Sequence, residues 1–247
     1  MQGTGQMIPP GQEPGAPPGQ QPGVPPAKAK PAAPPIPLEF QADKIMTQAE
    51  PELIALLKDS SATEFQRAMA CKRLAQVGTK VAVPALAALL ADQRLSHYAR
   101  FGLEPLPDPS ADETLREALK KLKGRLLVGV ITSIGQRQDA KAVEALAKLL
   151  YDADSEVARA AAAALGRISG PLAAKTLQAG LGKTKGALRT AVAEAGLVCA
   201  EGLMAQGDRK GAFAFYDVLS RADIPKTVRL AAMHSTIAAE TSLRRPR

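Results

Sequence analysis

The sequence predicts an all-α fold made of repeated pairs of helices, and three observations support this prediction. Segments of the chain resemble one another at shifts of about 30 residues. Their apolar residues recur at i, i+3, i+4 and i+7, as on one face of an amphipathic helix. No segment of useful length alternates apolar and polar residues, so strands are not expected. Since apolar residues make up 46% of the 247 residues and aromatic residues only 3%, the core should be sizeable and aliphatic.

The internal similarity is clearest among the segments expected to form the first helix of each pair. PELIALLKD (51–59) aligns with PALAALLAD (84–92) at a shift of 33 residues. VAVPALAALLAD (81–92) aligns with KAVEALAKLLYD (141–152) at a shift of 60 residues, or about two repeats. These segments predict first helices that face their neighbours with an apolar side.

A second type of helix alternates with the first, since RLAQVG (73–78) resembles ALGRIS (164–169). Small residues near the ends of the second helices fit left-handed C-terminal caps: Gly78, Gly135, Ser169 and Gly170. The two helix types predict about six hairpins, with approximate limits 47–78, 79–108, 109–138, 139–169, 170–207 and 208–241. Because each hairpin buries its apolar faces only against its neighbours, the expected architecture is an α-solenoid.

Five consecutive alanines, residues 160–164, lie in the middle of one predicted second helix. Small side chains let two helix backbones approach closely, and alanine has the highest helix propensity. We therefore expect this helix to be buried against neighbouring second helices. The two cysteines, Cys71 and Cys199, lie far apart in the sequence and are expected to be small buried apolar residues.

The two ends of the chain differ from the repeats. Residues 1–37 are rich in proline, glycine and glutamine, which predicts a disordered arm that is either a spacer or a ligand for a proline-binding module. Residues 38–241 should form the solenoid, and residues 242–247 a basic tail. The N-terminus lacks the features of a signal peptide, so a cytoplasmic location is the default, and a periplasmic location applies if the N-terminus is incomplete. No apolar run is long enough to predict a membrane span.

The stretch DSEVARAAAAALGRI (154–168) resembles the second helix of a HEAT repeat in its short, alanine-rich bacterial form, which also occurs in phycobilisome-lyase-type repeats. AVPALAALLAD (82–92) resembles the matching first helix, and residues 40–235 are similar to bacterial HEAT-repeat proteins best known from planctomycetes. The resemblance implies a right-handed superhelix that interacts with macromolecules, and it implies no reaction. Residues 200–219 depart from it, because they resemble a tetratricopeptide unit, which is also a helical hairpin.

Arginines recur near the predicted starts of the second helices: Arg67, Arg100, Arg125, Arg159, Arg189 and Arg229. In HEAT repeats the matching arginine commonly pairs with an aspartate, and Asp154 with Arg159 fits that pair. One interpretation is therefore an internal ladder of Asp–Arg pairs, and the other is a basic inner groove for an acidic partner. Second helices typically line the inner face of such a solenoid, which makes these residues the candidate contacts: Arg67, Lys72, Arg100, Glu104, Arg189, Glu194 and Arg229.

Residues suited to catalysis or metal binding are sparse. His97 and Tyr98 could do acid–base chemistry with Glu104, but adjacent residues point to different sides of a helix, so packing is the preferred interpretation. Two histidines and two isolated cysteines give no ligand cluster, and we predict neither a metal nor a cofactor.

The net charge of +8 is spread unevenly, since residues 1–37 carry +1 and the final RRPR carries +3, which leaves +4 for the repeats. This value is ordinary, and few aromatic residues are present to stack on bases. We therefore expect a non-catalytic scaffold that binds another protein. The alternatives are a solenoid that binds DNA through a basic concave face, and an accessory protein of the phycobilisome-lyase type.

Overall fold

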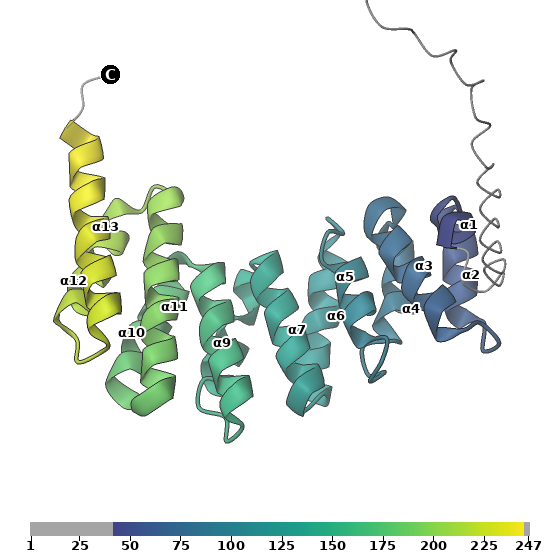
Figure 1. Ribbon diagram of the computed structural model, residues 1–247, viewed down its shortest axis with the longest axis horizontal. Helices are drawn as coiled ribbons and strands as arrows, with labels where there is room; N and C mark the ends of the chain where they lie inside the picture. The colour runs from purple at the N-terminus through teal and green to yellow at the C-terminus, as the bar shows by residue number, and fades with distance from the viewer. Residues whose placement is uncertain (1–41, 245–247) are drawn as a thin grey trace, which may run out of the picture. The chain divides into compact units, whose positions relative to one another are not determined.

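The computed structural model describes residues 42–244, and within this range the chain forms helices and no strands (Figure 1). The predicted all-α fold is confirmed. The predicted arm, residues 1–37, lies outside the described residues, as do residues 245–247 of the predicted basic tail. None of the helices in residues 42–244 is long and apolar enough to cross a lipid bilayer.

A short helix, α1 (Ala42–Met46), precedes six helical hairpins in the described part of the chain. The hairpins pair α2 (Glu50–Lys58) with α3 (Glu64–Val77), α4 (Val83–Ala87) with α5 (Ser96–Leu103), α6 (Pro109–Lys121) with α7 (Gly124–Arg137), α8 (Val143–Leu149) with α9 (Ser155–Ile168), α10 (Gly170–Lys183) with α11 (Gly186–Ala205), and α12 (Arg209–Arg221) with α13 (Lys226–Arg244). The 3-10 turns η2 (Lys80–Ala82) and η3 (Ala140–Ala142) lead into α4 and α8. The first five pairs lie within the predicted limits, and the sixth extends past residue 241 to Arg244.

Polar side chains fix the starts of several helices. Thr63 and Gln66 form a reciprocal capping box at the start of α3, in which the Thr63 hydroxyl accepts from the Gln66 amide at 3.2 Å. Asp108, Asp154 and Asp208 accept from amides in the first turns of α6, α9 and α12, each at 2.9 Å. These caps satisfy amides that have no partner inside the helix.

The hairpins form two layers, in which the first helices (α2, α4, α6, α8, α10 and α12) make one layer and the second helices (α3, α5, α7, α9, α11 and α13) make the other. The most extensive contacts between helices join α7 to α9 and α9 to α11, all within the second-helix layer. Figure 1 shows the hairpins following one another in a row from α2 to α13. The chain is therefore an α-solenoid, as predicted.

Small residues bring the second helices together. A Cβ atom added at Gly135 would lie 2.8 Å from the Cα atom of Ala164, and one added at Gly166 would lie 2.7 Å from the carbonyl oxygen of Ala195. Both distances are too short for real side chains. Within the alanine run, residues 161, 162 and 164 are buried, which confirms the expectation that alanine serves close helix packing.

The predicted left-handed caps at Gly78 and Gly135 are wrong. Gly78 has a φ of −69° and an extended backbone, and Gly135 lies inside α7, where it contacts the next helix. Helix α7 instead ends on Gln138, which is left-handed with a φ of 55°. Ser169 and Gly170 do have positive φ, but they form the junction at which α10 begins directly after α9.

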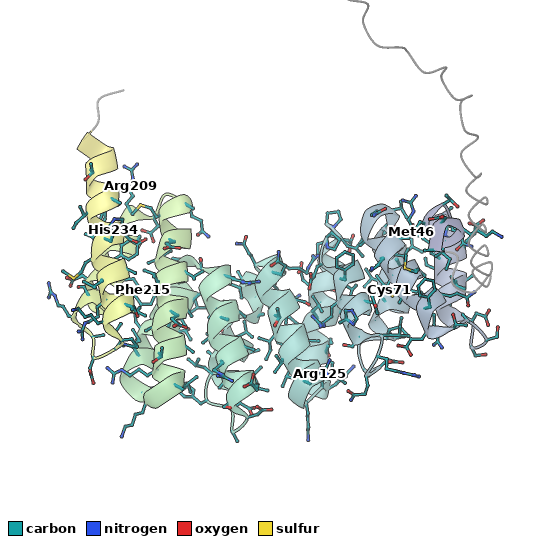
Figure 2. All side chains as sticks on the ribbon, viewed as in Figure 1. Met46, Cys71, Arg125, Arg209, Phe215 and His234 are labelled. Carbon is teal, nitrogen blue, oxygen red and sulfur yellow. The ribbon has the colours of Figure 1, made fainter. Side chains whose placement is uncertain are left out.

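The interior is aliphatic, as the composition predicts, with Phe215 fully buried near the C-terminal end (Figure 2). Cys71 in α3 and Cys199 in α11 are also fully buried, which confirms their expected role as small apolar residues. Burial raises the pKa of the Cys71 thiol to about 12 and that of the Cys199 thiol to about 11. Both thiols are therefore protonated at neutral pH.

Candidate protein-binding surface

The structure places all the recurring arginines in second helices, and all but Arg100 lie within the first five residues of a longer helix; Arg100 lies in the last turn of the short α5. The seven candidate contacts are not equally accessible. Lys72 and Glu194 are exposed, and the other five are half-buried: Arg67, Arg100, Glu104, Arg189 and Arg229. The candidates are spread over four second helices and the end of α5, and no hollow brings all of them together.

Arg100 and Glu104 are joined inside the fold through Ser133 of α7. The Arg100 guanidinium donates to the Gly129 carbonyl at 3.1 Å and to the Ser133 hydroxyl at 3.2 Å, and that hydroxyl donates to the Glu104 carboxylate at 2.7 Å. A Cβ atom at Gly129 would lie 2.7 Å from Cζ of Arg100, so only glycine leaves room for the guanidinium. Burial lowers the pKa of Arg100, against the effect of Glu104. These residues attach α5 to α7.

The expected pair between Asp154 and Arg159 does not form. Arg159 makes its ion pair with Glu156, three residues earlier on the same helix, and both side chains are exposed. The Asp154 carboxylate accepts from the Glu156 amide as the N-terminal cap of α9. An arginine five positions after the cap lies on a different side of the helix, whereas Glu156 faces it directly.

Two Asp–Arg pairs occur elsewhere, at positions that the sequence did not indicate. Arg137 at the end of α7 binds Asp112 of α6 through Nε at 2.5 Å and Nη2 at 3.1 Å, and its side chain is only 7% exposed. Its Nη1 also donates to the carbonyls of Leu103, Glu104 and Leu106. Arg116 of α6 binds Asp139 at 2.5 Å. The Asp112–Arg137 pair lies within the third hairpin, and the Arg116–Asp139 pair joins this hairpin to the residue that precedes η3. Neither pair includes one of the recurring arginines, so the predicted ladder is not found among the described residues.

The His97 and Tyr98 rings contact each other at a tilt of 39° with centroids 3.8 Å apart, and Lys72 Nζ lies 5.9 Å from the Tyr98 centroid. Phe101, one turn later, is 52% exposed. The two adjacent rings thus lie together, whereas the sequence reasoning expected them to point to different sides of the helix. Among the described residues, no group of three or more His, Cys, Asp or Glu side chains could hold a metal ion.

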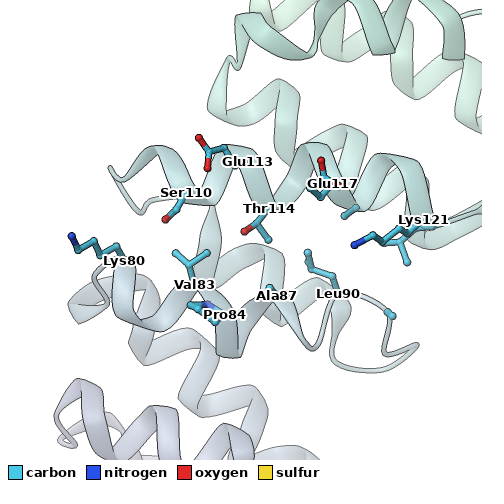
Figure 3. Close-up of a pocket in the computed structure, with 13 residues that line it drawn as sticks. Lys80, Val83, Pro84, Ala87, Leu90, Ser110, Glu113, Thr114, Glu117 and Lys121 are labelled. Carbon is cyan, nitrogen blue, oxygen red and sulfur yellow. The ribbon is translucent and has the colours of Figure 1, made fainter.

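A groove lies in the first-helix layer between α4 and α6, and sequence reasoning missed it. Its volume is about 560 Å³, and we call it the α4–α6 groove. Figure 3 shows Pro84, Ala87 and Leu90 on the α4 side and Thr114 on the α6 side. The groove is lined by Lys80, Val83, Pro84, Ala87, Leu90, Ala91, Ser110, Glu113, Thr114, Glu117, Ala118, Lys121 and Leu122.

Charged side chains surround this apolar lining. Lys80 and Lys121 lie at opposite ends of the groove, and Glu113 and Glu117 lie along the α6 wall (Figure 3). All four are exposed. The groove is thus an apolar trough with a charged rim, which is the composition of a site that orients an apolar segment.

The local sequence explains why the groove is open. Helix α4 has only five residues, VPALA, and the chain continues through turns until α5 begins at Ser96. The walls carry the small residues Ala87, Ala91 and Ala118, which do not fill the space between the two helices. The sequence did contain a signal for this groove: all five residues of the short helix α4 are apolar, so one helix face must remain without a partner inside the fold.

Residues 112–197, from α6 to α11, match the family model for HEAT repeats. This part of the chain therefore consists of HEAT repeats. The matched residues include both members of each buried Asp–Arg pair. No curated protein sequence matches the chain.

Several solved structures are similar to this chain. Two are engineered proteins from the Northeast Structural Genomics Consortium, each 22% identical over 74% of this chain, with TM-scores of 0.48 and 0.44. The aligned region covers 56% of the first engineered chain, little more than half of its length, and 94% of the second. The third is the complex of CpcE and CpcF of phycocyanin lyase from Nostoc sp. PCC7120, at 20% identity, with 83% of this chain and 81% of that chain covered and a TM-score of 0.42.

Proposed function

We propose that this chain, which contains HEAT repeats, is a non-catalytic scaffold that binds a segment of another protein in the α4–α6 groove. The observation that carries the proposal is the groove itself, an apolar trough of about 560 Å³ with charges at both ends and along one wall. Burying apolar surface contributes about 25 cal/mol per Å², so an apolar segment gains most of its binding energy from the lining. The rim charges then fix its orientation.

The second-helix face is a weaker candidate for the same role. Its two exposed predicted contacts, Lys72 and Glu194, carry opposite charges, and Arg100 and Glu104 are engaged with Ser133. This face therefore offers no uniform charge to an acidic protein or to DNA. Arg67, Arg189 and Arg229 remain predicted contacts of a secondary surface.

The proposal is tested by the same substitution on each layer. Thr114→Arg places a long charged side chain in the groove wall, and Thr132→Arg places it on the exposed surface of α7. We expect affinity capture from the source cell to retain the same partner with the wild type and with Thr132→Arg, and to lose it with Thr114→Arg. Thermal unfolding midpoints should be similar for all three proteins.

Equal partner retention by Thr114→Arg and the wild type would overturn the groove as the binding site. Loss of the partner with Thr132→Arg alone would move the site to the second-helix layer.

A further inference from the structure

The α4–α6 groove is the first of three successive hollows in the first-helix layer. A second, of about 720 Å³, lies between α6 and α8, and a third lies between α8 and α10. The hollows share walls, because Glu113 and Glu117 line both the first and the second, and Glu144 and Lys148 line both the second and the third. The three hollows therefore form one surface, which we call the grooved surface.

Apolar side chains recur on the grooved surface at every junction. Pro84 is exposed at the first hollow, Leu149 is half-buried at the second and Leu172 is exposed at the third, whereas Leu90 and Leu119 belong to the buried core. Tyr151 and Leu172 at the third hollow are 48% and 51% exposed, which is high for large apolar residues. A ligand that crosses the layer would meet an apolar spot at each junction.

The spacing of the junctions limits what can cross them. The closely packed second helices set a spacing of about 10 Å between successive hairpins, and the first helices, which are separated by the hollows, lie at least this far apart. An extended polyproline II segment advances about 9 Å in three residues, so every third side chain faces the same side. A segment with an apolar residue at every third position would therefore place one anchor in each hollow.

The charges of the grooved surface favour an acidic ligand. Five exposed lysines line the three hollows: Lys80, Lys120, Lys121, Lys141 and Lys148. The glutamates of the lining are Glu113, Glu117 and Glu144, and Glu117 is paired with Lys120 at 2.6 Å. Arg116 is neutralised by Asp139. The exposed lysines thus exceed the glutamates along the whole surface.

We propose that the partner segment is acidic, carries apolar residues at every third position, and lies in an extended conformation across all three hollows. This inference rests on the proposed function, because it names the chemistry of the segment that the α4–α6 groove binds. It extends the site by two junctions and assigns Lys141 and Lys148 to partner binding. An acidic partner therefore docks on the first helices, opposite to the layer that the arginine pattern indicated.

Three labelled peptides of 15 residues test the chemistry on the full-length protein by fluorescence anisotropy. The first contains five Leu-Glu-Pro repeats, the second five Leu-Lys-Pro repeats, and the third five Ser-Glu-Pro repeats. We expect the first peptide to bind at least tenfold more tightly than either of the others. Equal binding of the first and third would show a purely electrostatic surface, of the kind that also binds nucleic acid or anionic lipid, and would overturn the proposal. Equal binding of the first and second would also overturn it.

Two double variants test the location. Lys141→Glu with Lys148→Glu reverses charges at the second and third hollows, and Lys183→Glu with Lys185→Glu reverses two exposed charges near the start of α11 as a control. We expect the first to weaken Leu-Glu-Pro binding at least fivefold and the control to leave it within twofold. Equal effects of the two variants would sink the extended site.

The outcomes separate this inference from the proposed function. If Thr114→Arg abolishes capture of the partner while the Lys141→Glu, Lys148→Glu variant retains it fully, the α4–α6 groove binds a partner but the extended acidic segment is wrong. If neither variant affects capture, both proposals fail. If both variants lose the partner, both proposals are supported.

Discussion

The two helix layers differ in how neighbouring hairpins meet. In the second-helix layer, Gly135 meets Ala164 and Gly166 meets Ala195 so closely that an added Cβ atom would collide. In the first-helix layer, α4 and α6 leave a hollow of about 560 Å³ between small side chains. In the second-helix layer, small residues let long helices pack closely along their length. In the first-helix layer, small residues leave a space, because the five-residue α4 is too short to pack along α6 in the same way. The comparison predicts that substitutions in the two layers affect different properties.

The largest expected contrast is in thiol reactivity. Cys71 and Cys199 lie in the closed layer with raised pKa values of about 12 and about 11, whereas Ala91 is exposed at the edge of the α4–α6 groove. An exposed cysteine has a pKa near 8.5, so at pH 8 the thiol of Ala91→Cys should react with a disulfide reagent more than about a thousandfold faster than the native thiols. Absorbance of the released thiol measures both rates. Fast reaction of the wild-type protein would contradict a closed second-helix layer.

The next effect is the loss of Arg137, the guanidinium that joins the second and third hairpins. Arg137→Ala leaves Asp112 and the carbonyls of Leu103, Glu104 and Leu106 without their donor, and we expect it to cost about 3 kcal/mol of unfolding free energy. Arg159→Ala is the control, because its exposed pair with Glu156 contributes at most about 0.5 kcal/mol. Urea denaturation of both variants decides the matter, and similar losses would refute the structural role of Arg137.

A smaller loss is expected from filling the contact between α9 and α11. Gly166→Leu forces a side chain against the Ala195 backbone and should cost about 2 kcal/mol through overpacking. Gly182 in α10 has open space around its Cα atom, so Gly182→Ala should leave stability unchanged or raise it by at most about 1 kcal/mol. The urea midpoint of Gly166→Leu should therefore fall, whereas that of Gly182→Ala should stay the same or rise. A Gly166→Leu midpoint equal to that of the wild type would show that α9 and α11 can move apart at little cost.

The smallest expected change in stability comes from a substitution in the first-helix layer, which contains the α4–α6 groove. Thr114→Leu adds apolar volume inside the α4–α6 groove, where space is available, and should change the unfolding free energy by no more than about 0.5 kcal/mol. A loss comparable to that of Gly166→Leu would mean that the first-helix layer is as closed as the second, and the groove would then be a poor binding site.

Much of the fold was predictable because its causes are local. The spacing of apolar residues at i, i+3, i+4 and i+7 predicted the helices, and the repeat of about 30 residues predicted the limits of the hairpins. Both predictions hold because each helix packs mainly against neighbours that are near in sequence. The recurring arginines other than Arg100 also lie near the starts of the second helices, as predicted. The caps at Gly78 and Gly135 failed because a glycine near a helix end has two uses, a left-handed turn or a close contact, and the sequence does not distinguish them.

The candidate site was less predictable because its causes lie between hairpins. Arg137 binds Asp112 across 25 residues, and no local spacing marks that pair. The pair expected of Asp154 failed because its carboxylate accepts from a backbone amide of its own helix. The α4–α6 groove is a space, and a space depends on the distance between two helices, which side-chain types alone do not give.

The carbonyl contacts of Arg137 have a consequence for how the solenoid opens. Repeat proteins can unfold one unit at a time, because each unit interacts only with its neighbours. Here a single side chain at the end of α7 donates to the carbonyl of Leu103, the last residue of α5, to those of Glu104 and Leu106 after it, and to a carboxylate of α6. The amides of α5, α6 and α7 should therefore exchange with solvent deuterium as one cooperative unit, with a shared opening free energy.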